Sequence, residues 1–174
     1  MDHHDHIELI RRGVNSPGGE WADLGAGTGA FTLALAELLG PFGVIHAVDK
    51  NMSALRINDR EMRARFPDNE VRYQVEDFAL PLEIPPLDGI VMANSLHFQR
   101  HQLEVVRLVQ GYLRSGGKIV VVEYNLNRRN FAVPHPVPFS RWTELAETAN
   151  FVHTKLLMTR PSRFWYEIYS AVSW

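Results

Sequence analysis

The stretch 20–40 (EWADLGAGTGAFTLALAELLG) limits the possible folds of this 174-residue chain more than any other. A short apolar run leads into three glycines at alternate positions, and a leucine- and alanine-rich pattern with helical spacing then ends at Gly40. We therefore predict a strand, a glycine turn and a helix, with Thr28 as the helix N-cap. Because glycine has no side chain, a turn of this kind lets a ligand approach the backbone itself.

The turn has three interpretations: it binds a pyrophosphate, it binds a positively charged ligand, or it binds nothing. Gly25-x-Gly27-x-x-Ala30 satisfies the dinucleotide-binding fingerprint, in which a pyrophosphate lies at the helix N-terminus. Asp23 disfavours that ligand, because a carboxylate at the exit of the strand repels a pyrophosphate and attracts a positively charged group. The turn is also compatible with a tight strand-to-helix connection that binds nothing.

Strand-like and helix-like segments alternate from a short helix at 5–13 to residue 122. Beyond the first strand and helix, strands are predicted at 44–48, 71–76, 87–93 and 118–122, and helices at 52–66, with Asn51 as N-cap, and at 102–113. The run 118–122 is mostly β-branched, as expected for a central parallel strand covered on both faces. The alternation predicts an α/β fold with a doubly wound parallel sheet.

The C-terminal part departs from this alternation. A proline-containing loop at 125–139 precedes a helix at 141–150, which Ser140 is expected to cap. Two strand-like runs follow at 151–159 and 164–172, and the four residues between them permit a hairpin but not a parallel crossover. The sheet should therefore end in an antiparallel strand, whereas a dinucleotide-binding domain would add a parallel sixth strand.

The composition of the chain limits where the protein is expected to be located and which classes of partner it is expected to bind. The chain fits one domain, 1–174, with 45% apolar and 22% charged residues, as in ordinary soluble proteins. No apolar run approaches the roughly 18 residues of a membrane span, and the first residues lack a signal-peptide pattern, so we expect a cytoplasmic protein without membrane segments. Cysteine is absent, which excludes disulfides and thiolate metal sites. A net charge of −2 does not favour nucleic acid as a partner, although Arg128, Arg129 and Arg141 are candidates for a local basic patch.

Asp23-x-Gly25-x-Gly27-x-Gly29 resembles motif I of the class I S-adenosyl-L-methionine (SAM)-dependent methyltransferases. The resemblance runs in motif order from about Ile7 to Trp174, and it is to the small, single-domain, type 11/12-like members of that family. It implies a Rossmann-like, doubly wound sheet of seven strands in the order 3-2-1-4-5-7-6. In that sheet the last strand is inserted antiparallel beside the fifth.

The resemblance also implies where SAM would bind. The motif I residues would hold its methionine portion against the loop backbone; they are Asp23, Gly25, Ala26, Gly27 and Gly29. Asp49, about 20 residues beyond the last glycine, would accept both ribose hydroxyls, as the equivalent acid of dinucleotide enzymes also does. Lys50 stands where the family usually has an apolar residue against the adenine, and its aliphatic stem can take that place.

Two further segments match the family's cofactor motifs. Asp77 and Phe78 correspond to the residues that contact the adenine, and Asn94 begins the segment at the end of the strand that faces the sulfonium. Each has a purely structural alternative, because Asp77 can cap the following turn and Asn94 can bond within its own turn.

The sequence contains fewer signals for the side of the site that binds the methyl acceptor, and no catalytic triad is visible. Methyl transfer from SAM mainly requires that the two reactants be aligned. If the nucleophile is a hydroxyl, His97 is the candidate general base, because imidazole titrates near neutrality; a hydrogen-bonded loop histidine is the alternative. Tyr124, Asn125 and His135 are expected at the substrate wall because they follow the fifth strand.

No metal site is expected. His97 and His101 have a helical ligand spacing, but no third ligand follows at a motif spacing. His3, His4 and His6 are expected to lie in a frayed, solvated N-terminus, which does not hold ligands in place.

Together these features predict a SAM-dependent methyltransferase that moves a methyl group to an O, N or C nucleophile of a small-molecule acceptor. S-adenosyl-L-homocysteine would be the second product. The alternatives are a non-catalytic SAM-binding regulatory or assembly subunit, an NAD-dependent oxidoreductase and a nucleic-acid methyltransferase. The sequence indicates no particular oligomeric state.

Overall fold

The structure is a computed structural model, and it describes residues 1–162 and 167–174. Its strands are β1 (Gly19–Leu24), β2 (Gly43–Val48), β3 (Glu70–Gln74), β4 (Leu87–Ala93), β5 (Leu113–Tyr124), β6 (Thr154–Pro161) and β7 (Glu167–Ser173). Its helices are α1 (His3–Arg11), α2 (Ala30–Leu39), α3 (Met52–Arg65), α4 (Gln102–Gln110) and α5 (Phe139–Thr148), with single 3-10 turns η1 (Gly40–Phe42) and η2 (Leu96–Phe98).

The strands form one seven-stranded sheet in the order β3-β2-β1-β4-β5-β7-β6. The first five strands are parallel, and β7 runs antiparallel to both β5 and β6. The predicted α/β class, strand order and terminal hairpin are therefore confirmed. This hairpin stands in place of the parallel sixth strand that the dinucleotide interpretation requires. The first residues of its predicted second strand, 164–166, lie outside the described residues.

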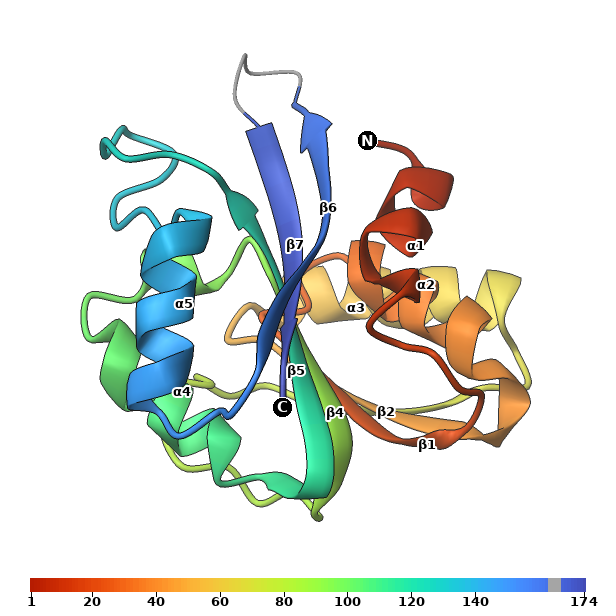
Figure 1. Cartoon of the computed structure of the whole chain (residues 1–174). Helices are drawn as coiled ribbons and strands as arrows, with labels where there is room; N and C mark the ends of the chain where they lie inside the picture. Colours follow the sequence, from red (N-terminus) through yellow and green to blue (C-terminus); the bar gives the residue numbers. More distant parts are fainter. Residues whose placement is uncertain (163–166) are drawn as a thin grey trace.

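The sheet is covered on both faces, with α1, α2 and α3 on one side and α4 and α5 on the other (Figure 1). Alternate residues of β5 face opposite sides: Val120 and Val122 belong to the core beneath α1 and α2, whereas Ile119 and Val121 belong to the core beneath α4 and α5. Because both faces are buried, the strand needs apolar residues at every position, and this explains its unbroken β-branched run. No helix among the described residues is long and apolar enough to cross a bilayer.

The predicted N-caps Thr28 and Ser140 are wrong, whereas Asn51 does cap α3 through its side chain. Gly29, with φ of 99°, is the N-cap of α2, so Thr28 lies one residue outside it. Only glycine adopts this left-handed conformation without strain, and the loop geometry therefore sets the start of the helix. Pro138 precedes α5, and Ser140 lies inside the first turn without a capping bond.

Two further boundaries differ from the prediction. The N-terminus is helical from His3 instead of frayed, because Asp2 and Asp5 form a reciprocal capping box and His3 Nε2 lies 2.8 Å from Glu37 Oε2. The helix predicted at 102–113 ends at Gln110, since Leu113 already pairs with Leu87 as the first residue of β5.

Candidate functional site

A cavity of about 430 Å³ opens where β1, β2, β3 and β4 end. The segments that follow these four strands supply its lining residues: Gly25, Asp49, Lys50, Glu76, Asp77, Phe78, Asn94, Ser95, Phe98 and Gln99. Parallel strands bring their carboxyl ends to one edge, so residues far apart in the sequence meet there. Six of the ten predicted cofactor-binding positions line the cavity: Gly25, Asp49, Lys50, Asp77, Phe78 and Asn94.

The glycine loop is held against the segment after β4. Gly25 has φ of 84°, and a Cβ on it would lie 2.5 Å from Ser95 Cβ, so no other residue fits without displacement. The Ser95 hydroxyl donates to the Leu24 carbonyl at 2.8 Å, which fixes the two segments together. Sequence reasoning did not single out Ser95, although it follows Asn94 in the same motif.

Asp49 ties the end of β2 to the glycine loop. Its Oδ2 accepts the Gly27 backbone N–H at 2.9 Å, and its Oδ1 accepts that of Asn51 at 2.8 Å. A carboxylate has about four lone-pair sites, so two remain for a ligand. Asp49 therefore both shapes the loop and presents acceptor capacity to the cavity.

Asp77 and Phe78 form another part of the lining. Asp77 Oδ1 accepts the Ala79 N–H at 3.0 Å, so this carboxylate does cap its own turn while the residue lines the cavity. The Phe78 ring is buried in the core beneath α4, and it approaches the position that a Cβ of Gly25 would occupy, at 3.3 Å. The ring thus provides a flat apolar surface beside the loop.

Asn94 lines the cavity and has a buried, unsatisfied acceptor. It has φ of 51°, unusual for a residue other than glycine, and its backbone N–H donates to Val122 O at 2.8 Å. Its side-chain Oδ1 is buried and has no hydrogen-bond partner among the described residues. A buried acceptor without a partner costs about 1–3 kcal/mol, and the positive φ is a second local feature of the kind that gathers at binding sites.

Asp23 does not line the cavity. Its carboxyl group is buried and accepts the Thr32 hydroxyl at 2.7 Å, and the same hydroxyl accepts Asn58 Nδ2 at 2.8 Å. Burial raises the pKa of Asp23 to about 7, and the nearby Asp49 charge acts in the same direction. The Asp23–Thr32–Asn58 chain lies beneath the glycine loop and supports it from within.

The other motif I positions shape the loop from behind the cavity. Ala26 packs with Ala47 and Leu55. Gly27 donates to Asp49, as described above, and Gly29 faces Asn58, whose Oδ1 would lie 2.6 Å from a Cβ at that position.

His97 is buried, and it pairs with an acid that the sequence analysis did not single out. Its Nδ1 lies 2.6 Å from Glu123 Oε2, and Glu123 Oε1 accepts the backbone N–H groups of Leu96 and His97 at 3.0 and 3.2 Å. The Phe98 ring covers the imidazole, with 4.2 Å between ring centroids, and His97 does not line the cavity. The parallel register of β4 and β5, which pairs Ala93 with Val122, is the signal that places Glu123 beside this segment.

None of the three predicted substrate-wall residues lines the cavity, although Tyr124 and His135 lie near His97. The Tyr124 ring centroid is 6.2 Å from that of His97, and burial raises the pKa of Tyr124. The backbone N–H of His135 donates to His97 O at 3.0 Å, which brings the 125–139 loop alongside η2. Asn125 instead fastens that loop, since its side chain donates to Glu167 at 2.7 Å and accepts from the Phe139 N–H at 3.2 Å.

Two other predicted features can be compared with the structure. In the part of the chain that the structure describes, no group of three or more histidine, aspartate or glutamate side chains is arranged to hold a metal ion. Of the candidate basic patch, Arg128 and Arg129 are exposed, and Arg141 is ion-paired with Glu144 at 3.2 Å.

Comparison with known proteins agrees with this geometry. A family model described as a methyltransferase domain matches residues 22–119. The ubiquinone/menaquinone biosynthesis C-methyltransferase UbiE of Shewanella frigidimarina is 32% identical over 110 residues, which cover 63% of this chain and 44% of that protein. The UbiE protein of Pseudomonas aeruginosa (strain LESB58) is 29% identical over 120 residues, covering 68% and 46%. The chain thus spans less than half the length of these curated relatives.

Solved structures share the fold. The YcgJ protein from Bacillus subtilis superposes with a TM-score of 0.76 at 15% identity, over 98% of both chains. Magnesium protoporphyrin IX methyltransferase (ChlM) from Synechocystis, solved with bound SAM, gives a TM-score of 0.72 at 14% identity, over 98% of this chain and 77% of that one. The sheet order, the order of the motifs and the matched family model together show that this chain belongs to the class I SAM-dependent methyltransferase family.

Proposed function

We propose that residues 1–174 form one domain that binds SAM in the 430 Å³ cavity and transfers its methyl group to a small-molecule acceptor. The observation that carries this proposal is the convergence of Gly25, Asp49, Phe78 and Asn94 on that single cavity. An approachable backbone, a ribose-binding acid, an aromatic wall and an unsatisfied acceptor are the groups that an adenosine with an amino-acid tail requires.

Each group has a role in the proposed complex. The free lone pairs of Asp49 would accept the ribose hydroxyls, and Phe78 with the stem of Lys50 would pack against the adenine. Asp77 would accept the adenine amino group. The methionine portion would lie along the glycine loop, and its ammonium group would favour ionisation of the Asp23 carboxyl group beneath that loop.

The reaction would be an in-line displacement at the sulfonium methyl. A bond forms between the O, N or C nucleophile and the methyl carbon while the carbon–sulfur bond breaks, and its electron pair returns to sulfur to give the neutral thioether of S-adenosyl-L-homocysteine. The proton that the acceptor loses goes to a base or to solvent. Positioning supplies most of the rate enhancement in such a reaction, so the proposed mechanism does not require a catalytic triad.

His97 is the candidate base for a hydroxyl acceptor. A carboxylate accepts but does not donate, so the Glu123 contact keeps the proton of a neutral imidazole on Nδ1 and leaves Nε2 as the acceptor. Direct contact with an acceptor requires the exposed Phe98 ring to move aside, because this ring covers the imidazole.

The acceptor class is suggested by the relatives. The UbiE proteins are named as C-methyltransferases of ubiquinone and menaquinone biosynthesis. We therefore take aromatic, quinone-type rings as the first acceptors to test, followed by phenols and amines. The exposed Phe98 ring, which lines the cavity apart from the adenine side at Phe78, suits a flat acceptor ring.

Calorimetric titration with SAM and S-adenosyl-L-homocysteine tests the proposal. We expect both ligands to bind and NAD(H) not to bind, and no binding at millimolar SAM would overturn the assignment. A structure with S-adenosyl-L-homocysteine would then show the space facing the sulfur and so the size of the acceptor. Binding without turnover on a broad acceptor panel would instead identify a non-catalytic SAM-binding subunit.

A further inference from the structure

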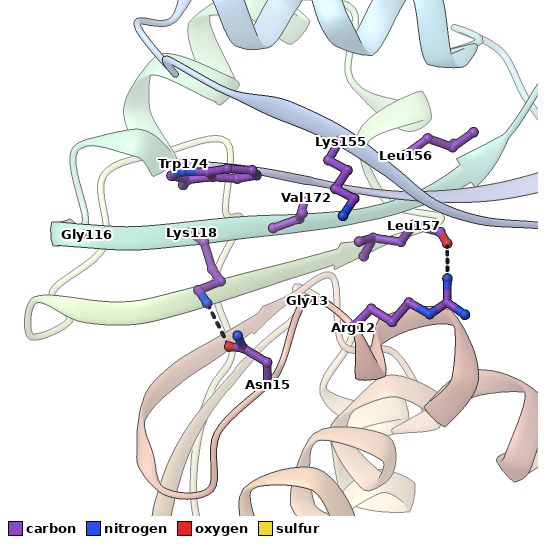
Figure 2. A pocket seen from close by; sticks show the side chains of 10 residues that line it. All are labelled: Arg12, Gly13, Asn15, Gly116, Lys118, Lys155, Leu156, Leu157, Val172 and Trp174. Atoms are coloured by element: carbon purple, nitrogen blue, oxygen red, sulfur yellow. Dashed lines mark hydrogen bonds between the residues drawn. The ribbon is translucent and has the colours of Figure 1, made fainter.

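A second cavity, of about 330 Å³, lies at the other end of the parallel strands (Figure 2). Lys118, which lines it, pairs with Gly89 near the start of β4, whereas the SAM cavity follows the ends of β1 to β4. The two cavities share no lining residue. This second cavity is therefore separate from the proposed site of methyl transfer.

The strand register gathers its side chains on one face of the sheet. Val172 of β7 lies opposite Val120 of β5 and opposite Lys155 of β6. Residues paired across strands share a face, and so do residues two apart on one strand. Lys118 and Trp174 therefore project from the same face as Lys155, although the three are far apart in the sequence.

The segment after α1 forms the wall of the cavity that faces the sheet. A Cβ on Gly13 would lie 2.5 Å from Val120 Cγ2, so glycine is what allows this segment to touch the sheet. Arg12 Nη1 donates to Leu157 O at 3.5 Å, and Lys118 Nζ donates to Asn15 Oδ1 at 2.9 Å. Figure 2 shows both of these contacts, with the Lys155 side chain extending from β6 toward the Gly13 segment.

The charged side chains that line this cavity are all basic. Arg12, Lys118 and Lys155 converge on it, and no aspartate or glutamate lines it. Some basic residues elsewhere are ion-paired, as Arg63 is with Asp59 at 2.9 Å, and others, such as Arg129, are exposed to solvent outside this cavity. In residues 1–162 and 167–174 none of the three cations has a carboxylate within ion-pair distance. In a chain of net charge −2, this is a local excess of uncompensated positive charge.

We propose that this cavity binds a small organic anion with two negative charges and a flat apolar ring. The three cations would pair with the anionic groups, and their remaining N–H donors are free to do so. The buried Leu157 and Val172 side chains and the Trp174 indole would contact the ring. Because the cavity lies away from the sulfonium position, its occupant is a second ligand of effector type and not the methyl acceptor.

Titration of the full chain with benzene-1,3-dicarboxylate, followed by NMR chemical shifts and calorimetry, tests this proposal. The dicarboxylate should bind more tightly than inorganic phosphate, which has charge without a ring, and benzyl alcohol, which has a ring without charge. Added salt should weaken the binding. No binding of the dicarboxylate at millimolar concentration would overturn the site, and equal binding of phosphate would overturn the requirement for a ring.

Variants assign the binding to this cavity. Lys155→Gln is the cleanest change, because no hydrogen bond or ion pair of this side chain is found among the described residues. It should weaken the dicarboxylate roughly five- to tenfold, as should Arg12→Gln. Arg129→Gln removes an exposed cation outside the cavity and is the matched control, with unchanged affinity expected. Equal weakening by Arg129→Gln would show that the anion binds only through general charge.

The outcome does not depend on the proposed methyltransferase function. The titration contains no SAM, so failure of SAM binding leaves its result interpretable. Saturating S-adenosyl-L-homocysteine should not displace the dicarboxylate, and displacement would place the anion in the SAM cavity and overturn the proposal.

Discussion

The Glu123 carboxylate and the His97 imidazole meet 2.6 Å apart in the interior, directly behind the segment that lines the cavity proposed for SAM. Glu123 also accepts the backbone N–H groups of Leu96 and His97, so one buried side chain at the end of β5 holds the whole η2 turn. The position of Ser95 and Phe98 on the cavity surface therefore depends on a residue that does not reach the cavity.

Glu123→Gln tests this relationship. The glutamine carbonyl oxygen can still accept both backbone N–H groups, but its amide nitrogen would donate to His97 Nδ1 and move the imidazole proton to Nε2, as in amide variants of a Ser-His-Asp triad. We expect a loss of about 1–3 kcal/mol in unfolding free energy. If His97 is the base, turnover should fall about 10²- to 10⁴-fold. The ¹⁵N shifts of the imidazole report the tautomer, and Glu104→Gln, at an exposed position, is the control. An unchanged tautomer would contradict the proposed role.

Asp49→Ala should weaken SAM binding by about 100-fold or more, measured by calorimetry, because the two proposed hydrogen bonds to this charged group contribute about 1.5–3 kcal/mol each. It also frees the Gly27 N–H and loosens the glycine loop. Asp49→Asn keeps one carbonyl acceptor and should give an intermediate affinity. Wild-type affinity in Asp49→Ala would remove Asp49 from the cofactor site.

Gly25→Ala and Gly116→Ala form a matched pair. Both glycines have positive φ, 84° and 79°, but a Cβ on Gly25 would lie 2.5 Å from Ser95 Cβ, whereas one on Gly116 would meet no atom within 4 Å. The backbone strain of about 1–2 kcal/mol is common to both, and overpacking adds about 1–3 kcal/mol only at Gly25. Urea unfolding should therefore show the larger loss for Gly25→Ala, with SAM binding lost in that variant alone. Equal losses would show that the loop yields to the added methyl group.

Asp23→Asn should change the pH dependence of stability. The folded-state pKa of Asp23 is about 7 against an ordinary 3.8, so the folded protein retains this proton while the unfolded chain releases it. The contribution is fully present below about pH 4, is lost as the pH rises to about 7, and amounts to roughly 4 kcal/mol. Asparagine does not titrate and can still accept the Thr32 hydroxyl.

The measurement for Asp23 is the difference in unfolding free energy between wild type and Asp23→Asn across pH 4 to 8. This difference should move in favour of the variant as the pH rises and level off above pH 7. Asp68→Asn, at an exposed position, should give a difference that does not vary with pH in this way. A flat difference for Asp23→Asn would mean that the buried carboxyl group has an ordinary pKa.

The terminal hairpin and the end of α2 at Gly40 were predictable because they depend on local patterns. Apolar runs, helical spacing and glycine positions act within a few residues, and the family resemblance supplied the order 3-2-1-4-5-7-6. The N-cap of α2 was not predictable in this way. Thr28 has the right side chain for a cap, but the backbone conformation at Gly29, set by its packing on Asn58, starts the helix one residue later.

The sequence alone also determined which residues end the strands, and hence that Gly25, Asp49, Asp77 and Asn94 would meet at one edge of a parallel sheet. Only the tertiary structure decided what each side chain contacts there. In the structure, Asp23 is buried under the loop, Asn125 fastens the 125–139 segment, and Glu123 contacts His97. The physical reason is that a backbone pattern is set by near neighbours, whereas hydrogen-bond partners, burial and the gathering of charges depend on how distant segments pack.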